Sequence, residues 1–416
     1  MNAVPSEPIV NVPFKKRNDC RGCRSNRLKI VIDYGPMPLA GSFLASGDVG
    51  RERLFPLTLL RCRDCTLMQV PEVVDPQIIF DQYSYASSTT QTLIGHFADM
   101  AHDIVGLGIT GDDLVVEFGC NDGVLVRPLR QLGVNVVGVD PSDVARLASE
   151  AKGWPLIGGY FNRATASEVL SRHGRAKVIV GNNVFAHVDE TDEILAAVST
   201  VLREDGMFVF EVQYQGDLIR DFQFDTVYHE HLCYYSVRSL VTMLGRFDMA
   251  IVDVQPIPIH AGSIRVLAAP NRSHRSASPA VERYLDAERH WNIERFAAGV
   301  EDRRFTLRKL IQDLRSAGRR VVAYGAAGRA TTLLNYCKLD THLVEYVADM
   351  SPLRQGRLVP GVRVPIYPIE TFHERYPDYA LMTAWNYEPE IIQKERGFLA
   401  AGGRFVIPLA NVRIAS

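Results

Sequence analysis

One stretch in the first half of the chain constrains the fold more than any other. The apolar run Leu114–Phe118 breaks at Gly119, and after Gly123 the composition becomes helical. This pattern is typical of a buried parallel strand, a tight turn and a helix start. A second apolar run begins at Val136 and ends at Asp140. The sequence therefore predicts a strand–turn–helix unit followed by a second strand with an acid at its tip.

The residues of this turn indicate the charge of its ligand. Its glycines let a bulky ligand approach the backbone, and Asp140 is placed to accept hydrogen bonds from both ribose hydroxyls. Neither G-x-G-x-x-G nor G-K-[ST] is present, and Glu117 would repel a pyrophosphate but suits a cation. The pattern resembles motif I of class I methyltransferases, whose cofactor is S-adenosylmethionine. The alternative is an α/β core turn without a ligand.

Three more apolar runs continue the alternation of strands and helices. They lie at 154–161, 177–183 and 207–212. The alternation over 112–212 predicts a doubly wound parallel α/β sheet, and ligands of such sheets bind at the carboxyl edge. The cofactor-binding residues predicted at this edge are Glu117, Gly119, Asn121, Gly123, Asp140, Phe161 (as a neighbour of the adenine) and Asn182.

Length and charge limit the remaining possibilities. With 416 residues the chain is too long for one ordinary domain. A net charge of −2 gives no indication of a nucleic-acid or membrane surface. No apolar run approaches the roughly 20 residues of a membrane span, and Met1–Lys16 lacks the layout of a signal peptide. We expect a cytoplasmic monomer.

Four of the seven cysteines form two C-x-x-C pairs. Cys20 and Cys23 make the first pair, and Cys62 and Cys65 make the second. Four thiolates at this spacing can surround Zn²⁺ tetrahedrally, and the metal would stabilise a stretch too small to form its own core. Because no coordination position stays open, we expect a structural zinc site. Four unconnected buried cysteines are the alternative.

Ionisable and aromatic side chains crowd together after the fifth strand, in 225–236. This stretch contains Tyr228, His229, Glu230 and His231. A His-x-His pair can bind a metal, but no further ligand cluster is adjacent and H-E-x-x-H is missing. Histidine beside a carboxylate is suited to proton transfer at neutral pH. We therefore favour acid/base chemistry over a metal site or a solvated turn.

Two other stretches allow both a functional and a structural interpretation. His187 lies just past the fourth strand, where it is either a site residue or a structural histidine. The segment Phe80–Ser88 is aromatic and hydroxyl-rich. It is either ordinary packing or a lid over the cofactor.

The last third of the chain repeats the strand–glycine turn–helix pattern. Strand-like stretches at 251–254 and 256–266 and a long helical region at 278–317 lead into it. The turn Tyr324–Gly328 then opens a helix whose N-terminus can hold an anion such as a diphosphate, with close packing as the alternative. Trp385 and Asn386 offer a surface on which a base can stack. We expect a second, Rossmann-like α/β domain.

The order of these parts resembles the S-adenosylmethionine-dependent sugar C-3 methyltransferases of deoxysugar biosynthesis, such as those of the tetronitrose pathway, over nearly the full chain. The matching stretches are Glu117–Gly123, Asp225–Ser236, His260–Arg265, Tyr324–Gly328 and Ala384–Asn386. The predicted domains are a zinc-binding module at 1–75, a methyltransferase domain at 76–245 and a nucleotide-sugar-binding α/β domain at 246–416.

That family methylates C-3 of a nucleotide-linked 4-keto-deoxysugar, and we expect the nucleotide to be dTDP. The resemblance implies that His231 is the base, with Glu230 and Tyr228 beside it and with Tyr83 and His187 lining the pocket. His229 stands where the family motif can carry Asp. The substrate-binding residues implied are His260, Arg265, Tyr324, Gly325, Trp385 and Asn386.

Two other functions remain open at this point. The methyl acceptor can instead be oxygen or nitrogen, which needs a much weaker base than carbon. Alternatively, the chain is a nucleotide-sugar-binding or redox protein with an inert central domain. The combination of Glu117, two glycines and Asp140 argues against that last possibility.

Overall fold

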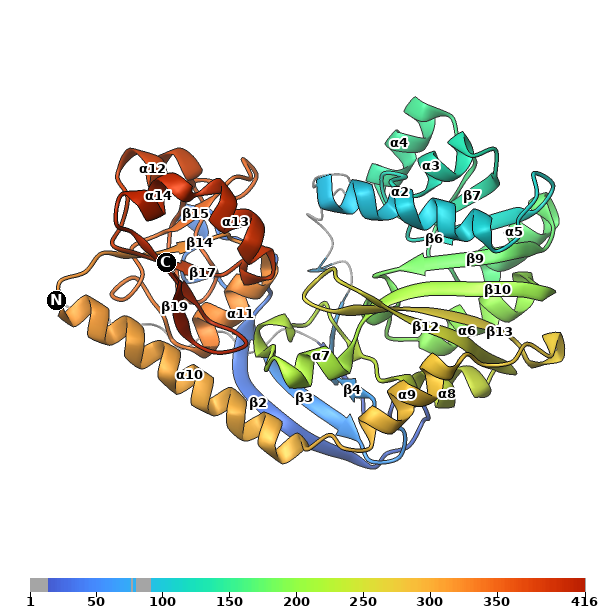
Figure 1. Ribbon diagram of the computed structural model, residues 1–416, viewed down its shortest axis with the longest axis horizontal. Coiled ribbons are helices and arrows are strands. Elements are labelled where there is room, and N and C mark those ends of the chain that lie inside the picture. Colours follow the sequence, from blue (N-terminus) through green and yellow to red (C-terminus); the bar gives the residue numbers. More distant parts are fainter. Residues whose placement is uncertain (1–13, 76–77, 80–90, 416) are drawn as a thin grey trace.

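The structure, a computed structural model, describes residues 14–75, 78–79 and 91–415. Two α/β lobes, each with its own sheet, stand on either side of the view, and strands β2 and β3 of an N-terminal module run along the bottom between them (Figure 1). The predicted combination of a cysteine-bearing module and two α/β units is confirmed. No helix within the described ranges is long and apolar enough to cross a membrane.

The central lobe contains a seven-stranded sheet in the order β12-β13-β10-β9-β6-β7-β8. Its strands are β6 (Leu114–Phe118), β7 (Asn135–Asp140), β8 (Leu156–Gly158), β9 (Ala176–Asn182), β10 (Leu202–Gln213), β12 (Met249–Ile257) and β13 (Ser263–Pro270). The first five pair in parallel, whereas β13 is antiparallel to both of its neighbours. This confirms the predicted doubly wound parallel sheet.

Helices bury both faces of this sheet, because neighbouring strand residues point to opposite sides. Val115 packs in one apolar cluster, whose helical members come from α2 (Gln91–Gly106), α3 (Val126–Gln131) and α4 (Asp143–Lys152). Val116 packs in another, which includes residues of three further helices. Those helices are α5 (Arg163–His173), α6 (Thr191–Val201) and α8 (Val237–Gly245).

The central lobe extends beyond residue 245, where the sequence analysis placed a boundary. The stretches 251–254 and 256–266, which we expected to open the C-terminal domain, lie in β12 and β13 of the central sheet. β13 adds antiparallel to the edge of β10, with Arg265 opposite Glu211. A short strand pattern does not reveal which of two sheets offers it a free edge, because that pairing is non-local.

The C-terminal lobe contains a six-stranded sheet in the order β16-β15-β14-β17-β18-β19. Its strands are β14 (Val321–Tyr324), β15 (Val347–Asp349), β16 (Ile366–Pro368), β17 (Tyr379–Met382), β18 (Arg404–Ile407) and β19 (Arg413–Ala415). All of its pairs are parallel except β18 with β19. Its shorter helices are α11 (Gly328–Tyr336), α12 (Ile369–Glu374), α13 (Glu388–Lys394) and α14 (Arg396–Ala400).

The helical region expected at 278–317 consists of two helices. These are α9 (Pro279–Glu288), which contacts β12 of the central lobe, and α10 (Ile293–Ser316), which runs along the edge of the C-terminal lobe (Figure 1). Ser278 and Asn292 cap their N-termini. The stretch between the two helices therefore joins one lobe to the other.

The N-terminal module has a four-stranded sheet in the order β11-β4-β3-β2. Strands β2 (Leu28–Pro38), β3 (Leu54–Cys62) and β4 (Met68–Gln69) belong to the module itself, and β11 (Cys233–Tyr234) comes from the stretch between β10 and β12 of the central sheet. A separate pair joins β1 (Phe14–Lys16) to β5 (Glu72–Val74). The module thus incorporates part of the His-rich segment.

Candidate active site

The turn after β6 holds two acids at the carboxyl edge of the central sheet. Glu117 is 3 % exposed, and its Oε2 has no hydrogen-bond partner among the described residues. Asp140, at the tip of β7, accepts hydrogen bonds from the N–H of Asn121 (2.9 Å) and of Ser142 (2.8 Å). These bonds fix the carboxylate at the turn. The two acids therefore lie where a ligand of this edge would bind.

Neither glycine of this turn leaves room for a side chain. Gly119 has φ +68°, and a Cβ there would lie 2.2 Å from Cγ2 of Val184. Gly123 has φ +75°, and a Cβ would lie 2.5 Å from the ring of Trp154. The close approach of these neighbours, together with positive φ, requires glycine at both positions.

The electrostatics of this edge favour a cation. Burial, with the charges of Asp140 and Asp122, raises the pKa of Glu117 well above its usual value. A positive ligand group beside these acids would relieve their repulsion. The sulfonium and ammonium groups of S-adenosylmethionine are such cations, and the cofactor carries no phosphate to oppose them. The residues present fit that cofactor.

The two remaining cofactor candidates are both buried but differ in their contacts. The ring of Phe161 stacks on Phe118 at 4.9 Å within the core, while its neighbour Tyr160 is 61 % exposed. Asn182 ends β9, where its Nδ2 lies 3.2 Å from Sδ of Met100 on α2 and its Oδ1 has no partner among the described residues. The Oδ1 of Asn182 is thus available to a ligand, whereas Phe161 packs in the core beneath the carboxyl edge of the sheet.

His231 has the geometry of a proton acceptor. Its Nδ1 lies 3.0 Å from the carbonyl oxygen of Thr226, so the ring carries its proton there and donates it. Nε2 is then the acceptor, and the hydroxyl group of Tyr228 donates a hydrogen bond to it at 2.8 Å. Burial and the nearby His187 hold the pKa of His231 well below its usual value. The side chain is therefore a neutral base at neutral pH.

Two more histidines surround it. His187 donates from Nδ1 to the carbonyl oxygen of Glu230 at 2.7 Å, and its ring centroid lies 5.0 Å from that of His231. Burial lowers the pKa of His187, and burial together with Arg329 lowers that of His260 to about 4. The cluster therefore stays uncharged at neutral pH.

The residues between Tyr228 and His231 face the N-terminal module. His229 is 1 % exposed and donates from Nε2 to the carbonyl oxygen of Pro56 at 3.0 Å. The side chain of Glu230 lies beside Gly41, and burial raises its pKa to about 7. The turn from Tyr228 to His231, closed by the bond from the His231 N–H to the Tyr228 carbonyl at 3.0 Å, thus directs the two side chains between them to the module.

The glycine turn of the C-terminal lobe approaches this cluster from the other side. A Cβ at Gly328, the first residue of α11, would lie 3.9 Å from the hydroxyl oxygen of Tyr228. Arg329 follows it, with its guanidinium 5.1 Å from the ring centre of Trp385 and with Nη1 buried and unpartnered among the described residues. The indole N–H of Trp385 donates to Asp225 at 2.7 Å.

The sequence analysis missed Arg329. A cation directly after a predicted glycine turn was the available signal, but an arginine in a first helical turn is usually solvated. Only the three-dimensional packing brings it to Trp385 and within the electrostatic reach of His231 and His260.

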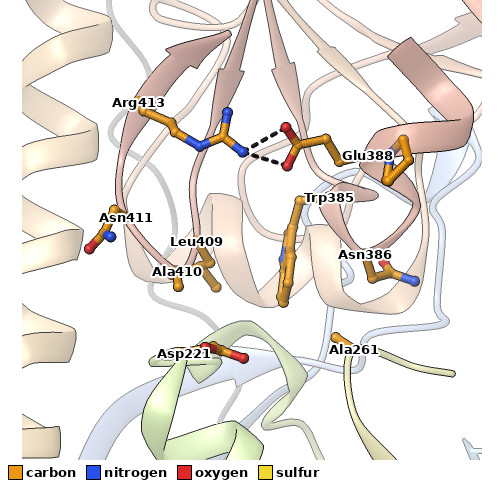
Figure 2. A pocket seen from close by; sticks show the side chains of 10 residues that line it. Asp221, Ala261, Trp385, Asn386, Glu388, Leu409, Ala410, Asn411 and Arg413 are labelled. Atoms are coloured by element: carbon orange, nitrogen blue, oxygen red, sulfur yellow. Dashed lines mark hydrogen bonds and ion pairs between the residues drawn. The ribbon is translucent and has the colours of Figure 1, made fainter. Parts of the chain in front are cut away.

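A cavity of about 440 Å³ opens beside Trp385 (Figure 2). It lies between the carboxyl edge of the C-terminal sheet and the central lobe, which contributes Asp221 and Ala261, the neighbour of His260. Its lining residues are Asp221, Ala261, Trp385, Asn386, Glu388, Pro389, Leu409, Ala410, Asn411 and Arg413. The two predicted base-stacking residues, Trp385 and Asn386, are therefore in one cavity.

Other predicted substrate residues are engaged elsewhere. Arg265 pairs with Glu211 on β10 (2.8 Å) and with Asp103 on α2 (2.6 Å). Tyr324 donates to Glu395 at 2.6 Å inside the C-terminal lobe. Gly325 has φ +98° and packs against Ala384. Tyr83 lies outside the described residues.

The pairing of Arg265 reveals a buried ionic network that the sequence analysis also missed. Glu211 is fully buried, and it accepts from Nε2 of His96 on α2 at 2.8 Å as well as from Arg265. A charged residue inside the apolar run 207–212 was the available signal. The network fastens α2 to the carboxyl edge of the central sheet.

The four cysteines of the N-terminal module meet at one point. Their sulfur atoms lie within 4.8 Å of one another, with 3.4 Å between Cys20 and Cys65 and 3.5 Å between Cys23 and Cys62. Tetrahedral zinc with Zn–S bonds of about 2.3 Å separates its sulfur ligands by about 3.8 Å. The predicted cysteine cluster is confirmed, and its donor set fits Zn²⁺.

Three family profiles match successive parts of the chain. The profile described as "Putative zinc binding domain" matches residues 20–80, "Methyltransferase domain" matches 98–254, and "C-methyltransferase C-terminal domain" matches 258–410. The fold and the carboxyl-edge site define an S-adenosylmethionine-dependent methyltransferase. The C-methyltransferase NovU of Streptomyces niveus is 38 % identical over 96 % of this chain and 97 % of its own length. The chain belongs to this C-methyltransferase family.

Two further similarities each cover less than half of this chain. A ubiquinone biosynthesis O-methyltransferase of Rhodopseudomonas palustris (strain BisB18) is 29 % identical over 23 % of this chain and 37 % of its own length. The glycopeptide N-methyltransferase MtfA, solved with S-adenosyl-L-homocysteine, is 14 % identical at a TM-score of 0.33, covering 42 % of this chain and 86 % of MtfA. That score is too low to support any comparison of sites.

Proposed function

We propose that this C-methyltransferase transfers a methyl group from S-adenosylmethionine to C-3 of a dTDP-linked 4-keto-deoxysugar through an enolate. The observation that carries the proposal is the geometry of His231, whose Nδ1 donates to the carbonyl of Thr226 and whose Nε2 is left as the acceptor that faces Tyr228. Methylation of carbon needs a base strong enough to form a carbanion. An amine or hydroxyl acceptor needs far less.

In the proposed reaction, Nε2 of His231 removes the C-3 proton, which the C-4 ketone acidifies. The hydrogen bond from Nδ1 to Thr226 stabilises the imidazolium that forms. S-adenosylmethionine, when bound, supplies the methyl group that the carbanion takes up, and the bonding electrons stay with sulfur. The His231 proton then passes to solvent. Once Nε2 of His231 is protonated, the Tyr228 hydroxyl no longer donates to it and is placed to donate a hydrogen bond to the enolate oxygen.

The charges around this base support an anionic substrate. The start of α11 and Arg329 present backbone N–H groups and a guanidinium next to Tyr228, which suits a diphosphate. Trp385 and Asn386 line the cavity on the same side. A nucleotide sugar would then place its nucleoside in the cavity, its diphosphate at Arg329 and its sugar at His231. We infer that the substrate is a nucleotide sugar.

The remaining assignments follow from the donor sets. Glu117, Asn121, Asp140 and Asn182 would hold the cofactor at the turn whose backbone shape Gly119 and Gly123 allow. The four cysteines would hold a structural Zn²⁺, since four thiolates leave no coordination position for substrate.

Solvent exchange tests this function. We would incubate the protein with a dTDP-4-keto-6-deoxysugar in D₂O, with and without S-adenosylmethionine, and follow C-3 by NMR and mass spectrometry. We expect deuterium at C-3 without cofactor and one added methyl group with it. His231→Asn should lower both rates by about 10³-fold, since general-base catalysis contributes on that order. His342→Asn, at an exposed histidine, is the matched control.

Each other result has a defined meaning. Methyl transfer without exchange, undiminished in His231→Asn, would move the acceptor to oxygen or nitrogen. Absence of both exchange and transfer in the wild-type protein would reject this substrate class.

A further inference from the structure

The segment that carries His231 is bonded to the central lobe, where Leu232 donates to the carbonyl of Ala186 at 2.9 Å, and also to the N-terminal module. Leu232 accepts a hydrogen bond from the N–H of Val70 at 3.0 Å, and β11 pairs with β4 directly after it. Thr66 and Ser236 join their hydroxyl groups at 2.7 Å. Together with the contacts of His229 and Glu230, these bonds reach along the whole segment 229–236.

The same part of the module contains half of the metal site. Cys62 ends β3, Cys65 lies in the turn, and β4 begins at Met68. The N–H of Cys62 bonds to the carbonyl of Leu67, and the N–H of Asp64 lies 3.4 Å from Sγ of Cys62. The cysteine cluster therefore shapes the turn whose second strand pairs with β11.

We propose that His229 is a positioning residue, which anchors the catalytic segment to the module and thereby sets the place of the base His231. This inference rests on the proposed function, because only there is His231 the base. His229 is buried in the module interface, where its ring also meets the edge of Phe55 at 5.7 Å. Its bond to Pro56 joins the segment to β3 by a side chain, in addition to the backbone pairing of β11.

The arrangement explains why histidine fits at this position. The acceptor is the backbone carbonyl of Pro56, so the side chain must donate the hydrogen bond. The donor atom is Nε2, at the far end of the imidazole ring, so the side chain must also be long and flat. An aspartate would present only acceptors to Pro56. Because His229 lies two residues before His231, loss of its anchor displaces the base without touching the cofactor edge.

Two variants and a control test the inference. His229→Leu removes the donor and keeps the bulk, whereas His229→Gln keeps an amide N–H near the position of Nε2. Ile32→Ala is the control, because it weakens the core of the same module on β2, the strand farthest from β11. The measurements are C-3 deuterium exchange per folded protein, the Kd of S-adenosylmethionine and thermal unfolding.

We expect His229→Leu to lower C-3 exchange about 10- to 100-fold, because small displacements of a base have effects of this size. The Kd of S-adenosylmethionine should stay within about twofold, His229→Gln should recover most of the rate, and Ile32→Ala should exchange normally once folded. Normal C-3 exchange in His229→Leu would overturn the inference. An equal loss of C-3 exchange in His229→Leu and His229→Gln would overturn it as well. Exchange absent already in the wild type would instead reject the proposed function.

A second readout does not depend on turnover. Amide hydrogen exchange, followed by mass spectrometry, should show faster exchange in 228–236 after His229→Leu and after removal of metal with a chelator. The amides of β6 and β7 should be unaffected, and added Zn²⁺ should restore protection to the chelated protein. Unchanged protection of 228–236 in both samples would contradict the proposed anchoring.

Discussion

The two lobes share one backbone arrangement but surround it with different side chains. In each, a buried strand ends in a glycine turn, and an acid at the tip of the next strand accepts a hydrogen bond from the turn. Asp140 accepts from the N–H of Asn121 at 2.9 Å in the central lobe. Asp349 accepts from the N–H of Ala326 at 2.6 Å in the C-terminal lobe.

The side chains around the two turns differ. Two residues before the first glycine, the central lobe has Glu117 and the C-terminal lobe has Ala323. After the second glycine, the C-terminal lobe has Arg329, whereas the central lobe has Val124. A buried carboxyl prepares one turn for a cation, and a guanidinium prepares the other for an anion. One or two side chains, and not the fold, therefore set the charge that each turn presents.

The largest effect that this comparison predicts follows from Glu117→Gln. The variant keeps the shape of the side chain but removes the carboxylate, so the cation loses a buried charged partner. We expect the Kd of S-adenosylmethionine to rise about 100-fold in isothermal titration calorimetry. The Kd of dTDP should not change. An equal loss of both ligands would mean that the two turns do not act independently.

The reverse experiment is Arg329→Gln. Loss of the guanidinium should raise the Kd of dTDP about 30-fold, because hydrogen bonds to charged groups contribute about 2 kcal/mol. Binding of S-adenosylmethionine should be unchanged, and Arg319→Gln, at an exposed arginine of the same lobe, should bind dTDP like the wild type. If dTDP binds Arg329→Gln normally while C-3 exchange falls, Arg329 acts on the enolate and not on the diphosphate.

Both glycine turns could be predicted from the sequence because their signals are local. Each combines an apolar run with glycines at fixed offsets, and the cysteine pairs likewise carry their own spacing. The sheet that β12 and β13 join could not be predicted, since it depends on the pairing of β13 with β10, which is distant in the chain. The contact of His229 with Pro56 joins residues 173 positions apart, so no pattern around His229 predicts it.

Arg329 and Arg265 both show that the role of a side chain cannot be predicted from its residue type alone. Arg265 was expected to bind substrate, but its guanidinium is held by Glu211 and Asp103. Arg329 had no predicted role, although its side chain lies against Trp385. The residue type reveals what a side chain can bind, whereas the neighbours that compete for it are known only from the packing.

The smallest predicted effect concerns Glu230, whose surroundings differ from those of Glu117. Glu117 lies where a cationic ligand fits, whereas Glu230 lies beside Gly41 of the N-terminal module, and burial raises its pKa to about 7. A carboxyl whose pKa is higher in the folded state stabilises the fold at low pH and loses that contribution as pH rises through the folded-state value. Between pH 6 and pH 8 the loss amounts to about 1.4 kcal/mol.

Glu230→Gln should abolish this dependence. We expect the free energy of unfolding, measured by urea denaturation, to fall by about 1.4 kcal/mol more in the wild type than in the variant between pH 6 and pH 8. Saturating S-adenosylmethionine should leave this difference intact, because Glu230 is not part of the cofactor edge. Parallel pH profiles for wild type and Glu230→Gln would show that Glu230 is already ionised at pH 6, as a carboxyl in contact with water would be.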